Sequence, residues 1–162
     1  MTQPAKTRVI AAALTISAGL LVSTAYKEGY RGEAYPDPAT KAAPWTIGFG
    51  ETQGVKRGDR TDPVRALARL ETSLDSHAAG VARCLTVPVS QGEFDASVDL
   101  AYNIGVGGYC KSSILTRFNN GDYWGGCMAF LLYTKARVNG KLTVMRGLVD
   151  RRWANYNTCI AS

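Results

Sequence analysis

Two carboxylates and a hydroxyl follow one another early in the chain, in an order suited to acid–base chemistry. Glu28 follows an uncharged run with helical character, Asp37 comes nine positions later, and Thr46 opens the run 46–50. Cleavage of a glycosidic bond needs a carboxylic acid that protonates the leaving oxygen, and a carboxylate that stabilises positive charge or activates water. A carboxylate at a helix end and another in the following loop can face each other across a cleft. The segment therefore indicates such a pair, with a nearby hydroxyl that can hold a water.

Each of these residues also has an ordinary structural explanation. A glutamate near a helix end is usually solvated, and an aspartate before proline commonly caps a turn. A threonine before alternating apolar residues is common in strands. It is their order and spacing, taken together, that favours the catalytic interpretation.

The same segment resembles the phage-type lysozymes, the endolysins of glycoside hydrolase family 24. In that family a catalytic Glu is followed by an Asp after eight intervening residues and by a Thr after five more. Glu28 and Asp37 match this spacing, whereas eight residues separate Asp37 from Thr46. We interpret the difference as a three-residue insertion within residues 39–44. The resemblance extends through most of residues 18–160, more weakly beyond Gly50.

This resemblance implies hydrolysis of the β-1,4 bond between N-acetylmuramic acid and N-acetylglucosamine in bacterial peptidoglycan, for lysis of the host cell. It makes Glu28 the general acid, which we expect to be partly buried so that it is protonated when needed. Asp37 would stabilise charge or orient water, and Thr46 would position that water. The resemblance also places Tyr102 and Asn103 where glycan is held, although both equally suit a helix end.

The resemblance implies no metal and no cofactor, and we expect a monomer. A different class of protein stays open, namely a catalytically silent cell-wall-binding protein with a lysozyme-like fold. The displaced position of Thr46 favours that alternative, and the intact spacing of Glu28 and Asp37 disfavours it.

Near the amino terminus, residues 9–26 carry no charged side chain over 18 positions. As a helix this run would span about 27 Å, slightly less than a bilayer core. Lys6 and Arg8 precede it, so the positive-inside rule places the body of the protein outside the cytoplasm. The run fits a cleaved secretory signal ending at Ala25, a buried core helix, or a signal-anchor that later leaves the membrane.

We favour the signal-anchor-release interpretation, because cleavage would remove the helix that carries Glu28. Residues 1–26 would then form the anchor, part of which becomes the first helix of a lysozyme domain over residues 27–162. We expect the protein to lie in the host inner membrane, facing the periplasm, and then to be released into the periplasm. While the run is anchored, Glu28 need not face Asp37, so release would complete the site.

The four cysteines lack any C-x-x-C spacing, which argues against zinc or redox chemistry. Four cysteines allow three pairings, and they also suit the core as free thiols. The family architecture implies that the helix bearing Cys127 packs near the final helix, so we expect Cys84–Cys110 and Cys127–Cys159. His77 is the only histidine, and a lone histidine does not indicate a catalytic triad.

Capping signals predict the helices of the body. Asp62 followed by Pro63 predicts one helix start, and Ser90 with Glu93 forms a capping box that predicts another. Further patterns predict a small hairpin around residues 46–51 and helices over residues 112–119, 122–135 and 146–159. The predicted fold is α+β and mostly helical, with a small hairpin lobe, a long helix and a helical C-terminal lobe, as in lysozymes.

Size and charge agree with this interpretation. The chain has 162 residues, enough for one domain with a sizeable core, and a net charge of +6 that is spread along it. A basic protein of this kind attracts anionic polymers. No basic helix interleaved with aromatic residues is present, so we expect peptidoglycan strands, and not nucleic acid, as the partner.

Overall fold

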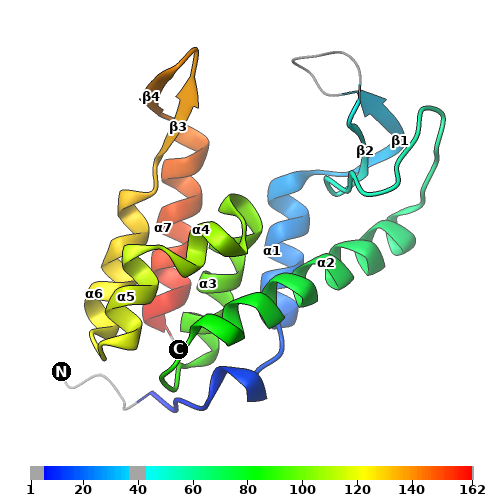
Figure 1. Cartoon of the computed structure of the whole chain (residues 1–162). Helices are drawn as coiled ribbons and strands as arrows, with labels where there is room; N and C mark the ends of the chain where they lie inside the picture. The colour runs from blue at the N-terminus through cyan, green and yellow to red at the C-terminus, as the bar shows by residue number, and fades with distance from the viewer. Residues whose placement is uncertain (1–5, 37–42, 162) are drawn as a thin grey trace. The chain divides into compact units, whose positions relative to one another are not determined.

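The computed structural model describes residues 6–36 and 43–161, whose path can be followed in Figure 1. Helices dominate and two small antiparallel hairpins accompany them, so the predicted α+β, mostly helical class is confirmed. The chain divides into two compact units. Residues 17–76 form the N-terminal unit, and the residues before 17 together with those from 77 onward form the C-terminal unit.

The N-terminal unit begins with helix α1 (Ala18–Glu28). Ser17 caps the helix, since its Oγ accepts a hydrogen bond from the Leu20 backbone N–H at 3.1 Å. Leu20 and Thr24 lie one turn apart and are the buried residues of this helix. The helix ends where Gly29 adopts φ 70°, a conformation that favours glycine.

The first hairpin pairs strand β1 (Arg31–Pro36) with strand β2 (Trp45–Gly48). Ile47 is buried, whereas the β1 residues stay exposed or half-buried, so the hairpin contributes one large apolar side chain to the core of its unit. A side chain at Gly48 would be excluded, because a Cβ there would lie 2.9 Å from that of Ala66. The glycine therefore allows the strand to approach the next helix closely.

That next helix is α2 (Pro63–Cys84), which runs from the N-terminal unit into the C-terminal unit. It begins where the sequence predicts, with Pro63 in first position and Asp62 Oδ1 accepting a hydrogen bond from the Arg65 backbone N–H at 3.0 Å. The buried side chains of α2 recur every three or four positions, as expected for one face of a helix: Ala66, Leu70, Leu74, Ala78 and Val81.

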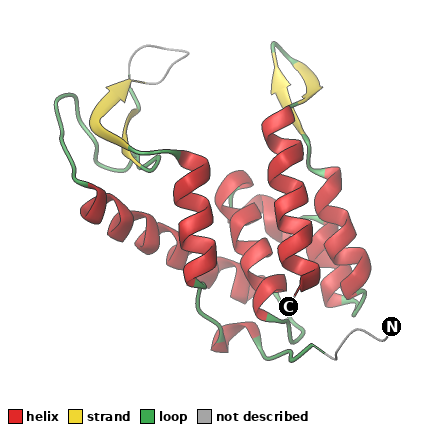
Figure 2. Cartoon of the chain, turned by 180° about the vertical axis from the view of Figure 1, so that it is seen from behind, coloured by secondary structure: helices red, strands yellow, loops and turns green. Residues whose placement is uncertain are grey.

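In the C-terminal unit, helix α3 (Gln91–Ile104) is the central element. Residues 92–101 are all buried, and Ser90 and Glu93 form the predicted capping box. Helices α4 (Val106–Cys110) and α7 (Arg146–Ala161) pack against α3. The short elements α5 (Ser113–Asn119), α6 (Tyr123–Ala129) and η2 (Phe130–Leu132) complete the helical part of the unit, and α6 and η2 pack on α7. Helices α3 and α7 pack side by side, and both views of the chain show them adjacent (Figures 1 and 2).

The segment before residue 17 also belongs to this unit. Val9 exchanges two backbone hydrogen bonds with Val89, at 3.0 and 2.8 Å, and a short 3-10 helix, η1 (Ala11–Ala13), follows. Gln91 Nε2 donates a hydrogen bond to the Thr15 carbonyl at 2.8 Å. We call the docked segment 6–16 the strap. In the folded protein the first part of the uncharged run 9–26 therefore belongs to the strap, and most of the rest forms helix α1.

Two disulfides close the C-terminal unit, and they are the two pairings expected. Cys84 at the end of α2 bonds to Cys110 at the end of α4, with Cα atoms 5.7 Å apart. Cys127 in α6 bonds to Cys159 in α7, with Cα atoms 5.6 Å apart. These bonds tie short helices to long ones.

A second hairpin, β3 (Lys135–Val138) with β4 (Lys141–Val144), was not predicted. The helix predicted over residues 122–135 ends at Ala129, so its last part is wrong. The hairpin turn is Asn139-Gly140, with φ 47° and 80°. An Asn-Gly pair between two short runs is a strong hairpin signal, and it was present in the sequence.

Candidate active site

Glu28 is the last residue of α1. Glu28 is exposed in the structure, so the expected partial burial is wrong. Directly after Glu28, Gly29 donates its N–H to the Ala25 carbonyl at 3.1 Å and ends the helix with φ 70°.

Asp37 lies outside the residues that the structure describes. It follows directly after Pro36, the last residue of β1, whose register partner is Trp45 at the start of β2. The eight residues from Asp37 to Pro44 therefore form the connection of the first hairpin.

Thr46 lies in β2, opposite Tyr35 of β1, and is half-buried. The register of the two strands shifts between Arg31 and Tyr35, before the pair that includes Thr46. Glu28 and Thr46 thus belong to the same compact unit, on a helix end and on the hairpin that follows it.

Tyr102 and Asn103 lie in the last turn of α3, in the C-terminal unit. The Tyr102 ring packs against the ring of His77, with centroids 5.3 Å apart. Asn103 is exposed, and its Oδ1 accepts a hydrogen bond from Arg152 Nη2. Because a guanidinium only donates, this contact orients the Asn103 amide so that its NH2 group faces away from Arg152.

A buried polar network between α3 and α7 supports Asn103, and sequence reasoning missed it. Arg151 binds the Asp99 carboxylate through two hydrogen bonds of 3.1 Å, and Asn155 Nδ2 donates to the same carboxylate at 2.7 Å. Arg152 Nη1 then donates to Asn155 Oδ1 at 2.6 Å. Burial lowers the pKa of Arg152 to about 10, so the guanidinium stays charged at neutral pH.

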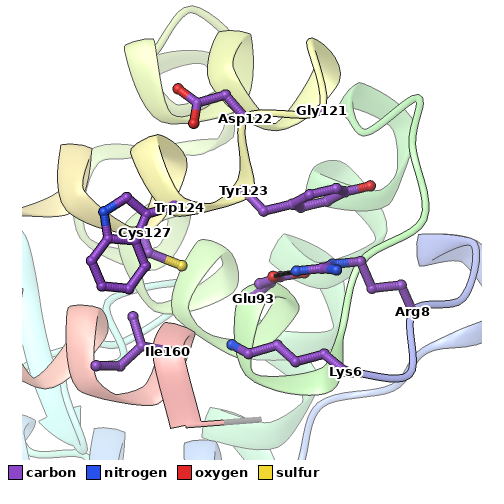
Figure 3. Close-up of a pocket in the computed structure, with 9 residues that line it drawn as sticks. All are labelled: Lys6, Arg8, Glu93, Gly121, Asp122, Tyr123, Trp124, Cys127 and Ile160. Atoms are coloured by element: carbon purple, nitrogen blue, oxygen red, sulfur yellow. Dashed lines mark hydrogen bonds and ion pairs between the residues drawn. The ribbon is translucent and has the colours of Figure 1, made fainter. Parts of the chain in front are cut away.

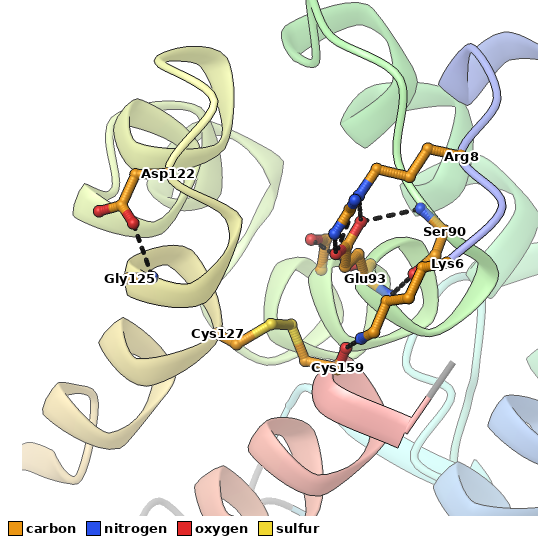
Figure 4. The surroundings of a disulfide bond; sticks show 9 residues. Lys6, Arg8, Ser90, Glu93, Asp122, Gly125, Cys127 and Cys159 are labelled. Atoms are coloured by element: carbon orange, nitrogen blue, oxygen red, sulfur yellow. Dashed lines mark hydrogen bonds and ion pairs between the residues drawn. A yellow bond between two sulfur atoms is a disulfide. The ribbon is translucent and has the colours of Figure 1, made fainter. Parts of the chain in front are cut away.

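A second ion pair, with a buried carboxylate and a partly exposed guanidinium, joins the amino-terminal strap to α3 (Figure 4). Arg8 donates from Nη2 to Glu93 Oε1 at 2.7 Å and from Nε to Oε2 at 3.0 Å. The hydrogen bond to Glu93 is the main cause that raises the pKa of Arg8. Lys6 Nζ also donates to the Cys159 carbonyl at 2.7 Å, so two cations of the strap are fixed on this unit.

These groups line a pocket of about 450 Å³ in the C-terminal unit. The guanidinium carbon of Arg8 lies 3.7 Å from the centroid of the Tyr123 ring. Figure 3 shows these two side chains against each other, with Lys6 and Trp124 also lining the pocket. The pocket contains none of the residues predicted to act on substrate. The pocket lies where the strap packs against the rest of the C-terminal unit.

Within the described residues, no group of histidine, cysteine or acidic side chains has the arrangement of a metal site. No helix of the described chain combines the length and the apolar character that crossing a membrane requires.

Comparison with known proteins gives a consistent result. A family model described as phage lysozyme matches residues 25–155. An endolysin of Acyrthosiphon pisum secondary endosymbiont phage 1 is 36% identical over 136 residues, which cover 84% of this chain and 90% of that protein. A SAR-endolysin of Pseudomonas phage phiKMV is 34% identical over 161 residues, which cover 99% of this chain and 93% of that protein.

Solved structures agree with the sequence matches. An endolysin from Escherichia coli O157:H7 phage FAHEc1 aligns with a TM-score of 0.84 at 30% identity, covering 92% of this chain and 95% of that one. The muramidase domain of SpmX from Asticaccaulis excentricus aligns with a TM-score of 0.84 at 28% identity, covering 91% and 99%.

Proposed function

Because the chain belongs to the phage lysozyme family and is a peptidoglycan-lytic glycoside hydrolase, we propose that it cleaves the β-1,4 bond between N-acetylmuramic acid and N-acetylglucosamine. The observation that carries the proposal is the family match over residues 25–155, which includes Glu28, Asp37 and Thr46 in the order that the chemistry needs.

In the proposed mechanism Glu28 donates a proton to the leaving oxygen. Its position at the end of α1 leaves the carboxyl accessible to a glycan. Asp37, in the connection after β1, stabilises the positive charge that develops on the sugar ring or orients water. Thr46 holds that water through its hydroxyl. Tyr102 and Asn103 contact glycan, and Asn103 does so as a hydrogen-bond donor, because Arg152 occupies its oxygen.

Replacement of Glu28 by Gln tests the mechanism, since it removes the transferable proton and keeps the shape. We expect the release of reducing ends from purified peptidoglycan to fall by at least about 100-fold. Glu71→Gln, an equivalent change at an exposed position of α2, is the matched control and should retain wild-type activity.

Other results of these assays would support a different function. Wild-type binding to peptidoglycan without new reducing ends would support a silent wall-binding protein. New free amino groups would support cleavage of the peptide. Equal activity of the Glu28 and Glu71 variants would refute the role assigned to Glu28.

We also propose that the protein is first held in the host inner membrane through residues 9–26, facing the periplasm, and is then released. Two observations support this: the uncharged run preceded by Lys6 and Arg8, and the similarity over almost the whole chain to a protein named a SAR-endolysin. Membrane and soluble fractions should both contain the full-length protein, with activity concentrated in the soluble fraction after the membrane is de-energised. Equal specific activity in the two fractions would contradict the proposal.

A further inference from the structure

We propose that the β3–β4 hairpin binds the acidic stem peptides that branch from the glycan of peptidoglycan. The inference rests on the proposed function, and it assigns a second part of the substrate to an element that the glycan chemistry does not use.

The hairpin is a well-formed element that projects apolar side chains into solvent. Four cross-strand pairs hold it, from Lys135 opposite Val144 to Val138 opposite Lys141. Its aliphatic side chains are nevertheless exposed to solvent, Leu142 to 66% and Val144 to 56%. A two-stranded hairpin is marginally stable alone, and a contiguous exposed apolar patch rimmed by polar residues commonly marks a binding site.

The charged side chains in and beside the hairpin are all basic. Lys135, Arg137, Lys141 and Arg146 lie in or beside it, and no acidic residue occurs in the sequence between Asp122 and Asp150. Within the part of the chain that the structure describes, no ion pair joins any of these four cations to a carboxylate. The chemistry that complements this surface is therefore a set of carboxylates.

One face of the β3–β4 hairpin carries both basic and exposed apolar side chains. The register places Lys135 opposite Val144 and Arg137 opposite Leu142, and directly opposed residues share a face of the sheet. Two cations on β3 thus lie beside two exposed aliphatic side chains on β4. Such a face suits a short peptide that carries carboxylates and small apolar groups, which is the chemistry of a peptidoglycan stem peptide.

Buried contacts connect the hairpin to the proposed glycan contact at Asn103. Arg152 donates from Nη2 to Asn103 Oδ1 and from Nε to the Tyr133 carbonyl at 3.2 Å. The next residue, Thr134, accepts the Met145 N–H at 3.0 Å and so closes the base of the hairpin. Glycan held at Asn103 would therefore carry its peptide branch near the base of the hairpin, within one compact unit.

The test compares intact peptidoglycan with the same glycan after an amidase has removed its peptides. The variant K135Q/R137Q removes the two cations of this face, and R69Q/R83Q removes two exposed cations elsewhere as a matched control. Thermal unfolding verifies that both variants fold. On intact wall we expect the hairpin variant to need roughly ten times more substrate for half-saturation, with the maximal rate kept. The expected factor is modest because each exposed ion pair contributes little binding free energy. On peptide-free glycan all three proteins should behave alike.

Binding is measured separately, by sedimentation with intact and peptide-free wall, and this readout needs no bond cleavage. Peptide-dependent binding of a protein that releases no reducing ends would refute the proposed function and leave the inference standing. The same half-saturation for all proteins, or an equal loss on both substrates, would overturn the inference. It would also be overturned if the hairpin variant lost binding to phosphatidylglycerol vesicles but kept its preference for intact wall, because the hairpin would then serve a membrane surface.

Discussion

Replacement of Arg8 by Met removes the guanidinium that pairs with the buried carboxylate of Glu93. The Glu93 side chain is 1% exposed, whereas that of Arg8 is 29% exposed. Three hydrogen bonds, of 2.7, 3.0 and 3.2 Å, join the two groups, and Arg8 also stacks on the Tyr123 ring. The pair is therefore asymmetric, because one partner can reach water and the other cannot.

This asymmetry sets the expected magnitudes. Loss of one member of a buried pair costs about 3–5 kcal/mol, because it strands a buried charge. In Arg8→Met the Ser90 N–H still donates to Glu93 Oε2 at 2.8 Å, so we expect the lower end of that range, about 3 kcal/mol. In Glu93→Gln the remaining charge is that of the partly exposed Arg8, so we expect about 1–2 kcal/mol.

Urea unfolding with both disulfides intact measures these differences as changes in the free energy of unfolding. The double variant should lose less than the sum of the two single losses, because each change removes the same interaction. Arg69→Met, at an exposed position of α2, is the control and should have little effect. A loss below about 1 kcal/mol for Arg8→Met, or a larger loss for Glu93→Gln, would refute the reasoning.

The same pair bears on membrane release. In the anchored state that we propose, Arg8 precedes the membrane segment on the cytoplasmic side, whereas Glu93 lies in the exported body. The pair can form only after release, so it stabilises the released form. Arg8→Met should therefore leave a larger fraction of the protein in the membrane than Arg69→Met does, as measured by fractionation.

The remaining predictions concern the C-terminal unit. The N–H of Gly125 and then Arg117 hold the pKa of Asp122 below its ordinary value of 3.8, so the unfolded chain takes up the proton first. The stabilisation by Asp122 is therefore present above pH 3.8 and is lost as the pH falls through the lower, folded-state pKa. Asp122→Asn lacks this carboxylate, so between pH 5 and pH 3 its urea midpoint should fall less than that of wild type. Arg152→Met should cost about 3 kcal/mol in urea unfolding, because it leaves buried acceptors unpaired, and Arg152→Lys should not restore the loss, since an ammonium lacks the planar fork.

Local signals in the sequence were sufficient for much of the fold. The Asp62-Pro63 pair predicted where α2 begins, and Ser90 with Glu93 predicted the start of α3. The one hairpin turn that was overlooked, Asn139-Gly140, was also readable locally, because its left-handed residues are a property of the turn itself.

The sequence by itself determined the features whose bonds close within a few residues. These are the helix caps, the helix end at Gly29, and the order of Glu28, Asp37 and Thr46 along the chain. Only the tertiary structure decided which residues meet across long separations. Arg8 and Glu93 are 85 positions apart, and Arg152 and Asn103 are 49 apart. No periodicity or cap encodes such contacts, because a buried charge finds its partner only after the segments that carry both have packed.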